Sequence, residues 1–191
     1  MRKETLYRIF SNIPELETER LRLRAMRVCD SEDMFDYARN PEVTRYLLWS
    51  PHRDISHTRA YLEYLAGRYR IGAHYEWAVI HKESGKMIGT CGFARIDCAH
   101  NCGELGYVLH PDYHNQGLMT EAATRVMRFG FQVLGLHRIE ARYMKENTAS
   151  RRVMDKLGLK FEGIAYESML VKGIYRDVAT CAILAKDFRA E

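Results

Sequence analysis

Hydrophobic residues recur along this chain with two periods, one typical of strands and one typical of helices. Leu21, Leu23 and Ala25 alternate with arginines, which is the pattern of a strand with one solvated face. Apolar positions three or four residues apart predict helices that begin at Asp30 or Ser31 and at Pro41, and that span residues 55–71, 117–133 and 148–157. Short apolar runs predict strands over residues 77–80, 87–96, 104–109, 138–143, 161–169 and 178–184.

Local signals indicate where these helices begin and end. Gly72 and Gly158 follow the last helical positions of two segments, where glycine commonly ends a helix. Thr148 is the expected N-cap of the last helix. The residues expected to face the core are Leu118, Ala122, Val126, Phe129 and Val133 in the long helix, and Ala149, Val153 and Leu157 in the last one.

The order of these elements predicts a mixed sheet. A turn at residues 83–86 and a loop at residues 97–101 join three strands into an antiparallel meander. The strand at residues 138–143 follows the long helix, so a right-handed crossover places it parallel to the strand at residues 104–109. Residues 1–18 have a weak pattern and are expected to form an N-terminal extension of a single domain, residues 1–191.

Composition favours one domain with a mixed surface. Of 191 residues 47% are hydrophobic, and 29 basic against 25 acidic residues give a net charge of +4, which requires no nucleic-acid partner. No apolar stretch approaches the roughly 20 residues of a membrane span, and no apolar signal segment follows residues 1–4, so we expect a cytoplasmic protein outside the membrane. The group Cys98, His100 and Cys102 lacks a second pair at zinc-ligand spacing, so no metal is predicted.

Residues 110–122 are the most informative segment for function. They join a buried strand to the long helix through a polar turn, where unpaired backbone N–H groups meet the positive end of the helix dipole. Such a junction binds phosphate. The segment has no Gly-x-Gly-x-x-Gly, and no Lys-Ser or Lys-Thr follows Gly117, which disfavours hydride transfer and nucleotide hydrolysis.

The same segment resembles motif A of the GNAT acetyltransferases, Arg/Gln-x-x-Gly-x-Gly/Ala, although only Gly117 matches the consensus. A longer frame resembles the family more specifically, and in particular the RimJ/RimL branch of ribosomal-protein N-acetyltransferases. It runs from Glu104-x-Gly106-Tyr107 through His-Pro-Asp-Tyr at residues 110–113 to Gly117-x-x-Thr-Glu-Ala. The resemblance covers residues 16–188 and implies an α/β (α+β) acyl-CoA N-acyltransferase fold, whose mostly antiparallel sheet contains two splayed parallel strands and is flanked by helices.

The resemblance also implies acetyl-CoA as the acyl donor. In the family, loop amides hold the pyrophosphate, and the strand before the loop, often bulged, splays from its parallel neighbour to admit the pantetheine arm. An Asn eleven residues before a helix-ending Gly is matched by Asn147 and Gly158; Asn147 would bond the pantetheine or only cap the helix. The residues expected to contact coenzyme A are Tyr107, Val108, Leu109, His114, Asn115, Gln116, Gly117, Leu118, Met119, Thr120, Asn147, Ser150 and Arg152.

Acetyl transfer needs a neutral amine, and Glu104 is the candidate base for it. This residue starts the otherwise apolar strand beside the expected cleft, where a carboxylate would receive the amine proton through water. The alternatives are a solvent-facing strand-end Glu and a Glu that only attracts a cationic substrate.

The departing thiolate needs a proton, and Ser150 is the candidate donor. Many members of the family place a Tyr seven residues after the Asn, where this chain has Met154. Ser150 stands three residues after the Asn, as in the ribosomal-protein branch; alternatively it bonds the backbone of its own helix. Glu167 is an alternate for positioning the amine, because it lies two residues before Met169, where that branch can carry a Glu, and residues two apart share a strand face.

Several amines remain open as the acceptor. An α-amine with a pKa of about 7.7–8.0 is roughly a tenth neutral at pH 7, whereas a lysine is almost fully charged. Deprotonating an N-terminal substrate therefore costs less free energy, and a weaker catalytic base is sufficient. The leading hypothesis is transfer to a protein N-terminus, such as that of a ribosomal protein, by direct attack in a ternary complex. The alternatives are a polyamine or aminoglycoside acceptor, or a non-catalytic acyl-CoA sensor. Edges of the last two strands are candidates for homodimer pairing.

Overall fold

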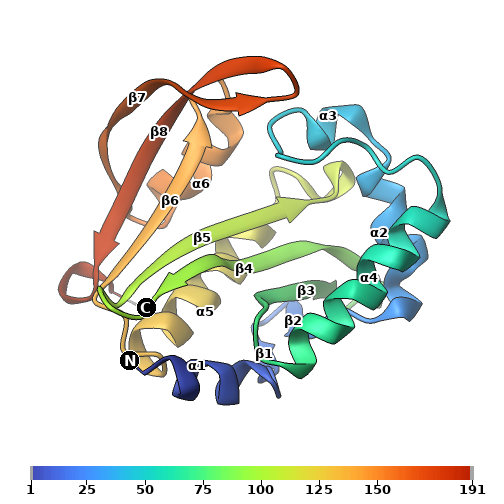
Figure 1. Cartoon of the computed structure of the whole chain (residues 1–191), viewed down its shortest axis with the longest axis horizontal. Helices are drawn as coiled ribbons and strands as arrows, with labels where there is room; N and C mark the ends of the chain where they lie inside the picture. The colour runs from blue at the N-terminus through green and yellow to red at the C-terminus, as the bar shows by residue number, and fades with distance from the viewer. Residues whose placement is uncertain (1, 190–191) are drawn as a thin grey trace.

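The computed structural model describes residues 2–189 and consists of one mixed sheet with helices on both faces (Figure 1). The described strands are β1 (Leu16–Glu17), β2 (Leu21–Arg24), β3 (Tyr75–His81), β4 (Met87–Asp97), β5 (Cys102–Leu109), β6 (Arg138–Met144), β7 (Lys160–Val171) and β8 (Ile174–Leu184). The α-helices are α1 (Lys3–Phe10), α2 (Ser31–Ala38), α3 (Pro41–Thr44), α4 (Ile55–Arg70), α5 (Leu118–Gln132) and α6 (Thr148–Lys156). Short 3-10 turns are η1 (Val28–Asp30), η2 (Pro111–Tyr113) and η3 (Ala185–Asp187).

Within residues 2–189 the strands form a sheet in the order β1-β2-β3-β4-β5-β6-β8-β7. The pair β5 and β6 is parallel and its register covers only Cys102 to Glu104 on β5, after which the two strands separate (Figure 1). The predicted meander and the parallel crossover are therefore confirmed. Of the two last strands only β7 is an edge, because β8 pairs with β6 on one side and with β7 on the other.

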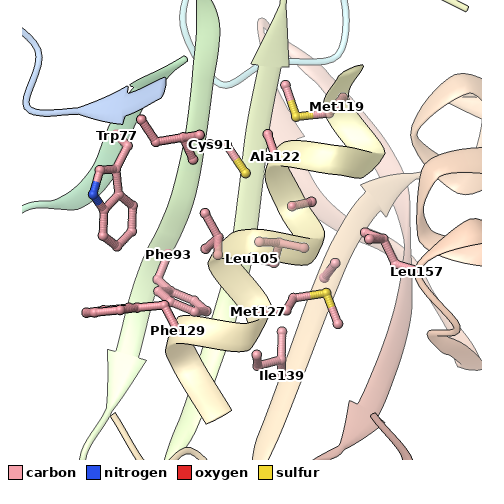
Figure 2. Close-up of a cluster of buried hydrophobic side chains, with 14 of the residues drawn as sticks. Trp77, Cys91, Phe93, Leu105, Met119, Ala122, Met127, Phe129, Ile139 and Leu157 are labelled. Atoms are coloured by element: carbon pink, nitrogen blue, oxygen red, sulfur yellow. The ribbon is translucent and has the colours of Figure 1, made fainter. Parts of the chain in front are cut away.

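Side chains alternate across the sheet and build two hydrophobic layers. On β3, Trp77 and Val79 belong to the layer under α5, whereas Ala78 and Ile80 belong to the layer under α2 and α4. Burying one large apolar side chain stabilises a fold by about 1.5–3 kcal/mol, so this packing holds α5 and the loop at its N-terminus firmly against the strands. Figure 2 shows the α5 layer, with Met119, Ala122, Met127 and Phe129 over Trp77, Cys91, Phe93, Leu105 and Ile139.

The described part of the first 18 residues is integrated into this core. Helix α1 buries Leu6 and Phe10, and the Phe10 ring lies edge-on to Trp77 with 5.6 Å between ring centroids. The helix has only eight residues, which leaves little room for a periodic pattern. The segment expected as an extension thus covers one end of the sheet.

The face of β2 that was predicted to be solvated is exposed at Arg22 but covered at Arg24. Arg24 is buried and its guanidinium contacts the Asp30 carboxylate at 2.7 Å. Asp30 occupies the N-cap position of α2, but its carboxylate accepts bonds from Arg24 and from the Arg27 N–H instead of capping the helix. An ion pair that covers one residue leaves the alternation of the sequence unchanged, so the pattern predicts the exposure of Arg22 but not the burial of Arg24.

Two helix ends also differ from the prediction. Val133 lies just beyond α5 and is exposed, so the apolar stripe ends at Phe129. In α6 the buried positions are Met154 and, just after the helix, Leu157, whereas Ala149 is exposed. Among residues 2–189, no helix has the length and apolar character needed to cross a membrane.

Candidate active site

The separation of β5 from β6 leaves one edge of β5 open. Beyond Glu104, residues 105–109 stay paired with β4 on one side, while β6 continues beside β8. Backbone N–H and C=O groups along this edge are available to an extended ligand, as when a peptide adds to the edge of a sheet. The predicted splay is thus confirmed, with Tyr107, Val108 and Leu109 along the open edge.

The open strand leads through η2 into a loop that ends at the N-terminus of α5. Gly117 has a φ of 78° and Asn115 a φ of 60°, left-handed conformations that turn the chain sharply. The first bond of the helix runs from the Glu121 N–H to the Gly117 carbonyl at 3.0 Å. In the described chain, the N–H groups of residues 115–120 donate to no backbone carbonyl, so they lie free at the positive end of the helix.

Side chains preorganise this loop. The His114 Nε2 lies 3.0 Å from the Leu109 carbonyl oxygen, and the Gln116 amide donates to the Asp112 carbonyl at 3.0 Å. Both side chains therefore fold back on the loop itself. Arg20, at the start of β2, donates to the Gln116 carbonyl at 3.0 Å and to the Glu121 carboxylate at 2.7 Å.

A cavity of about 420 Å³ adjoins the start of α5. Three basic residues and two acidic ones line it: Arg125, Arg128, Lys156, Glu17 and Glu121. Burial, and then the charge of Arg128, lower the pKa of the Arg125 guanidinium. These cations were not predicted from the sequence, although two arginines three residues apart on one helix were a usable signal. Arg152, which it named, is exposed and does not line this cavity.

Tyr107 of β5 meets α6 across the splay. Its hydroxyl lies 3.0 Å from the Ser150 Oγ and 3.1 Å from the Ser150 carbonyl oxygen, and burial raises the pKa of Tyr107 well above its ordinary value. The Ser150 N–H donates to the Asn147 Oδ1 at 3.1 Å. Asn147 is therefore the N-cap of α6, in place of the predicted Thr148.

Glu104 lies where β5 and β6 part, with 13% of its side chain exposed. Its carboxylate accepts two hydrogen bonds from Arg142, from Nε and from Nη2, each at 2.9 Å, and the Arg95 Nε is 3.8 Å away. Such a bidentate pair fixes both carboxylate oxygens. Glu104 lies beside the point where the strands part, as predicted from its position in the sequence, whereas its arginine partner was not predicted.

A larger cavity, of about 800 Å³, opens on the α2 and α4 side of the sheet. Gly106 and Thr90 line its floor, and its walls include the aromatic residues Tyr37, Trp49, His57 and Tyr61. In the described chain the buried Tyr37 hydroxyl has no hydrogen-bond partner.

Glu76 of β3 also lines this cavity and was missed by the sequence analysis. With 23% of its side chain exposed, the carboxyl has a pKa raised by burial to about 7. The signal was available, because Glu76 is the one acidic residue in an otherwise apolar and aromatic run, residues 75–80.

The acetyltransferase (GNAT) domain family matches residues 20–160 of the chain. This chain belongs to the GNAT acetyltransferase family. It is 34% identical over 173 residues to the uncharacterised N-acetyltransferase p20 of Bacillus licheniformis, with 91% of this chain and 97% of that protein covered. It is similar to the crystal structure of a GNAT-family acetyltransferase from Bacillus anthracis, with a TM-score of 0.81, 29% identity, and coverage of 91% and 99%.

Two further relatives of this GNAT enzyme have named substrates. The [ribosomal protein uS5]-alanine N-acetyltransferase of Escherichia coli (strain K12) is 30% identical over 190 residues, covering 93% of this chain and 95% of that protein. The spermidine N(1)-acetyltransferase of the same organism is 30% identical over 107 residues, covering 56% and 58%. The predicted GNAT family and GNAT fold are thus confirmed. The predicted resemblance to the ribosomal-protein branch is confirmed as a resemblance.

Two of the irregularities in the described sheet depart from the expected geometry of this GNAT enzyme. The extra residue near the cleft is Ala94 of β4, because the register shifts between Phe93 and Arg95, whereas β5 itself was expected to be bulged. A second irregularity lies in β7 around Glu167, whose φ is 46°. The two-residue alternation that placed Glu167 and Met169 on one face does not hold there. Glu167 is exposed and does not line the larger cavity, and its role in positioning the amine stays a prediction.

Proposed function

We propose that this GNAT enzyme transfers the acetyl group of acetyl-CoA to an acceptor that has one primary amine next to an apolar group. The preferred acceptor is the N-terminal α-amine of a protein. The observation that carries the proposal is the position of two sites along one strand. The larger cavity is lined by Gly106, Tyr107 and Val108, and the loop of free N–H groups follows the same strand at Leu109. A donor held by the loop and laid along the open edge therefore reaches the floor of the cavity.

The residues beside the loop fit coenzyme A. Backbone N–H groups of residues 115–120 and the N-terminus of α5 suit a pyrophosphate, and the cations Arg125 and Lys156 suit further phosphate charge. The open edge of β5 offers the amide-bonding groups that a pantetheine arm requires. When bound, acetyl-CoA supplies an activated thioester.

Direct attack by the amine in a ternary complex is favoured over an acyl-cysteine intermediate. Cys91 is the cysteine paired in register with Tyr107, and it is fully buried. Burial raises the pKa of the Cys91 thiol, which opposes formation of the nucleophilic thiolate. On the donor side, the hydroxyls of Tyr107 and Ser150 would supply a proton to the departing sulfur. On the acceptor side, Glu104 and Glu76 are the carboxylates available for the amine proton.

The lining of the cavity supports an acceptor with one ammonium group. Its carboxylates are Glu76 and Asp54, and Asp54 is used as the N-cap of α4, where it accepts a bond from the His57 N–H at 3.0 Å. A polyamine or aminoglycoside would bring several charges against a largely aromatic wall. A peptide N-terminus brings one charge, and the apolar wall would hold its first side chain. The extent of similarity to the uS5-alanine enzyme agrees with this choice.

The test is mass-spectrometric detection of acetylated product after incubation with acetyl-CoA and a mixed panel of amines. The panel contains peptides with free Ala or Ser termini, the same peptides formylated at the α-amine but carrying an internal lysine, spermidine and an aminoglycoside. We expect acetylation of the free termini and none of the formylated peptides. Acetylation of spermidine or the aminoglycoside alone would overturn the choice of acceptor, and binding of acetyl-CoA without any product would favour a sensor.

A further inference from the structure

We propose that Glu76 of β3 is the group that receives the proton of the acceptor amine, in place of Glu104. This inference rests on the proposed acetyl transfer and names the residue that makes the amine nucleophilic. It follows from a row of three residues across the sheet, from the placement of that row at the splay, and from the distribution of cations around the two carboxylates.

The row consists of Glu76, Gly92 and Gly106 on three adjacent strands. Glu76 pairs in register with Gly92 of β4, and Gly92 pairs with Gly106 of β5. A Cβ on Gly92 would stand 2.3 Å from the Glu76 Cα and 2.9 Å from its Cβ, so this position admits only glycine. With two side chains absent from the row, the Glu76 carboxylate extends over β4 toward β5.

The carboxylate reaches the open strand. A Cβ on Gly106 would lie 3.6 Å from the Glu76 Oε1, in ordinary contact. Gly106 is two residues beyond Glu104, the last residue of β5 that pairs with β6, and so it is the first residue on that face after the strands part. Glu76 thus presents an oxygen to the cavity floor at the place where the strand edge becomes free.

Charge distinguishes the two carboxylates. Glu104 is held by Arg142 through both oxygens and has Arg95 nearby. In contrast, no lysine or arginine nitrogen of the described chain lies within 4.0 Å of Glu76, whose only nearby basic group is the His74 Nε2 at 3.6 Å. Burial lowers the pKa of His74 to about 4, so that ring is neutral at pH 7.

The other titratable groups around Glu76 are also uncharged at neutral pH. Burial raises the pKa of each of them above its ordinary value, and they come from α2, α4 and β4: Tyr37, Tyr61, Tyr69 and Cys91. Arg53 lines the same cavity but does not come within 4.0 Å of Glu76, so an incoming ammonium would be the nearest full positive charge to this carboxylate. With a pKa raised by burial to about 7, the carboxyl is matched to proton transfer near neutral pH.

One proton passes from the ammonium group to the Glu76 carboxylate, which leaves a neutral amine. The lone pair of the amine forms the new C–N bond while the C–S bond of the thioester breaks. The second proton lost from nitrogen goes to the departing thiolate. Glu76 then returns its proton to solvent, so the net products are an acetylated amine, free thiol and one proton.

The experiment compares pH profiles of kcat/KM for a free-N-terminal peptide in four proteins: wild type, Glu76→Gln, Glu76→Asp and Glu104→Gln. An α-amine is roughly a tenth neutral at pH 7, so we expect Glu76→Gln to lose about tenfold or more at pH 7 and to recover toward wild type at pH 9, where the amine is already neutral. In the pH profile of kcat/KM for Glu76→Gln, the midpoint of the rise on the acid side should move from near pH 7 to the pKa of the amine. Glu76→Asp and Glu104→Gln should keep the wild-type midpoint.

Two results would overturn the inference while leaving acetyl transfer intact. One is a wild-type pH profile in Glu76→Gln. The other is a loss in Glu76→Gln that stays constant from pH 7 to pH 9, as a merely structural role would give. The shift in melting temperature caused by coenzyme A, measured for each variant, confirms that the donor site is folded. If the wild-type protein itself gives no acetylated peptide, it is the proposed function that fails.

Discussion

The Tyr107 hydroxyl lies 3.0 Å from the Ser150 Oγ, and this contact joins the open strand β5 to the first turn of α6. The Tyr107 hydroxyl is also 3.1 Å from the Ser150 carbonyl oxygen. When Tyr107 donates to that carbonyl, the Ser150 hydroxyl donates to Tyr107, so the two hydroxyls form a short relay. Seven residues after Asn147, where many GNAT enzymes carry a Tyr, this chain has the buried Met154, which has no hydroxyl to offer.

Removal of either hydroxyl should slow the release of the thiol. General acids contribute about 10²- to 10⁴-fold to the rate of catalysed reactions, so we expect Ser150→Ala and Tyr107→Phe each to lower kcat by about 10²-fold. Because the hydroxyls act as a unit, the double variant should lose little more than either single one. Steady-state kinetics with saturating acetyl-CoA and peptide measures this.

Ser168→Ala is the matched control for this prediction. Ser168 is also a serine that bonds a backbone carbonyl, that of Ala165 at 3.1 Å, but it is exposed on β7. We expect it to keep the wild-type kcat. Normal kcat in Ser150→Ala would exclude the serine from the relay, and fully additive losses would indicate two independent roles.

The conformation of Gly117 makes a prediction about residues 115–120, the donor loop that is proposed to hold acetyl-CoA. A non-glycine residue in a left-handed conformation costs roughly 1–2 kcal/mol, and a Cβ on Gly117 would find Arg20 Nη2 as its nearest neighbour at 3.7 Å. Gly117→Ala should therefore fold with reduced stability and should distort the row of free N–H groups. We expect KM for acetyl-CoA to rise about tenfold, which corresponds to about 1.4 kcal/mol of lost binding.

Gly85→Ala separates backbone strain from loop function. Gly85 has a φ of 71°, and a Cβ there would meet nothing within 4 Å. Thermal unfolding should show similar destabilisation in both variants, because the strain is the same. An equal KM for acetyl-CoA in both would contradict the assignment of the loop as a phosphate site.

The basic cavity beside α5 makes a prediction about salt dependence. Arg125→Ala removes a cation whose pKa is lowered by burial and by Arg128, so it relieves a repulsion in the free enzyme but removes attraction for phosphate. We expect KM for acetyl-CoA to rise and to become less sensitive to added salt. Arg22→Ala, which removes an exposed arginine from β2, is the control of equal charge and should leave KM unchanged. If both variants change KM for acetyl-CoA equally, Arg125 acts only through the net charge of the protein and not through a local contact with phosphate.

Most of the fold could be predicted because local patterns and tertiary structure agree here. The spacing of Leu118, Ala122, Val126 and Phe129 predicts α5, and Gly117 marks its start. The donor loop was predictable for the same reason, since free N–H groups follow from any strand, turn and helix N-terminus in succession.

The acceptor side depends on register and on long-range charge pairing, which no local pattern encodes. The row from Glu76 to Gly106 requires two strand registers to be known, and the Arg142 partner of Glu104 lies 38 residues away in sequence. The bulge at Glu167 likewise breaks the alternation on which a strand prediction depends.

Glu76 should also make the stability of the fold depend on pH. An unfolded Glu has a pKa of about 4.3, whereas burial raises the pKa of Glu76 to about 7. The folded state therefore binds this proton more tightly, so its contribution to stability is present below about pH 4 and is lost as pH rises through 7. Replacing the carboxyl by an amide removes that loss, and Glu76→Gln should be more stable than wild type at pH 8 by at most about 4 kcal/mol.

The measurement is the difference in free energy of unfolding between wild type and Glu76→Gln from about pH 4 to pH 8. His74, whose pKa burial lowers to about 4, changes stability in the opposite direction, but it is present in both proteins and cancels in the difference. Glu104→Gln should behave oppositely and lose stability at neutral pH, because Arg142 loses its bidentate partner. A difference between wild type and Glu76→Gln that does not change with pH would show that Glu76 is not held in a protonation-sensitive environment. If the stability advantage of Glu76→Gln grows as the pH rises, the carboxylate at the floor of the larger cavity destabilises the folded protein, as expected for a buried carboxylate without a cation beside it.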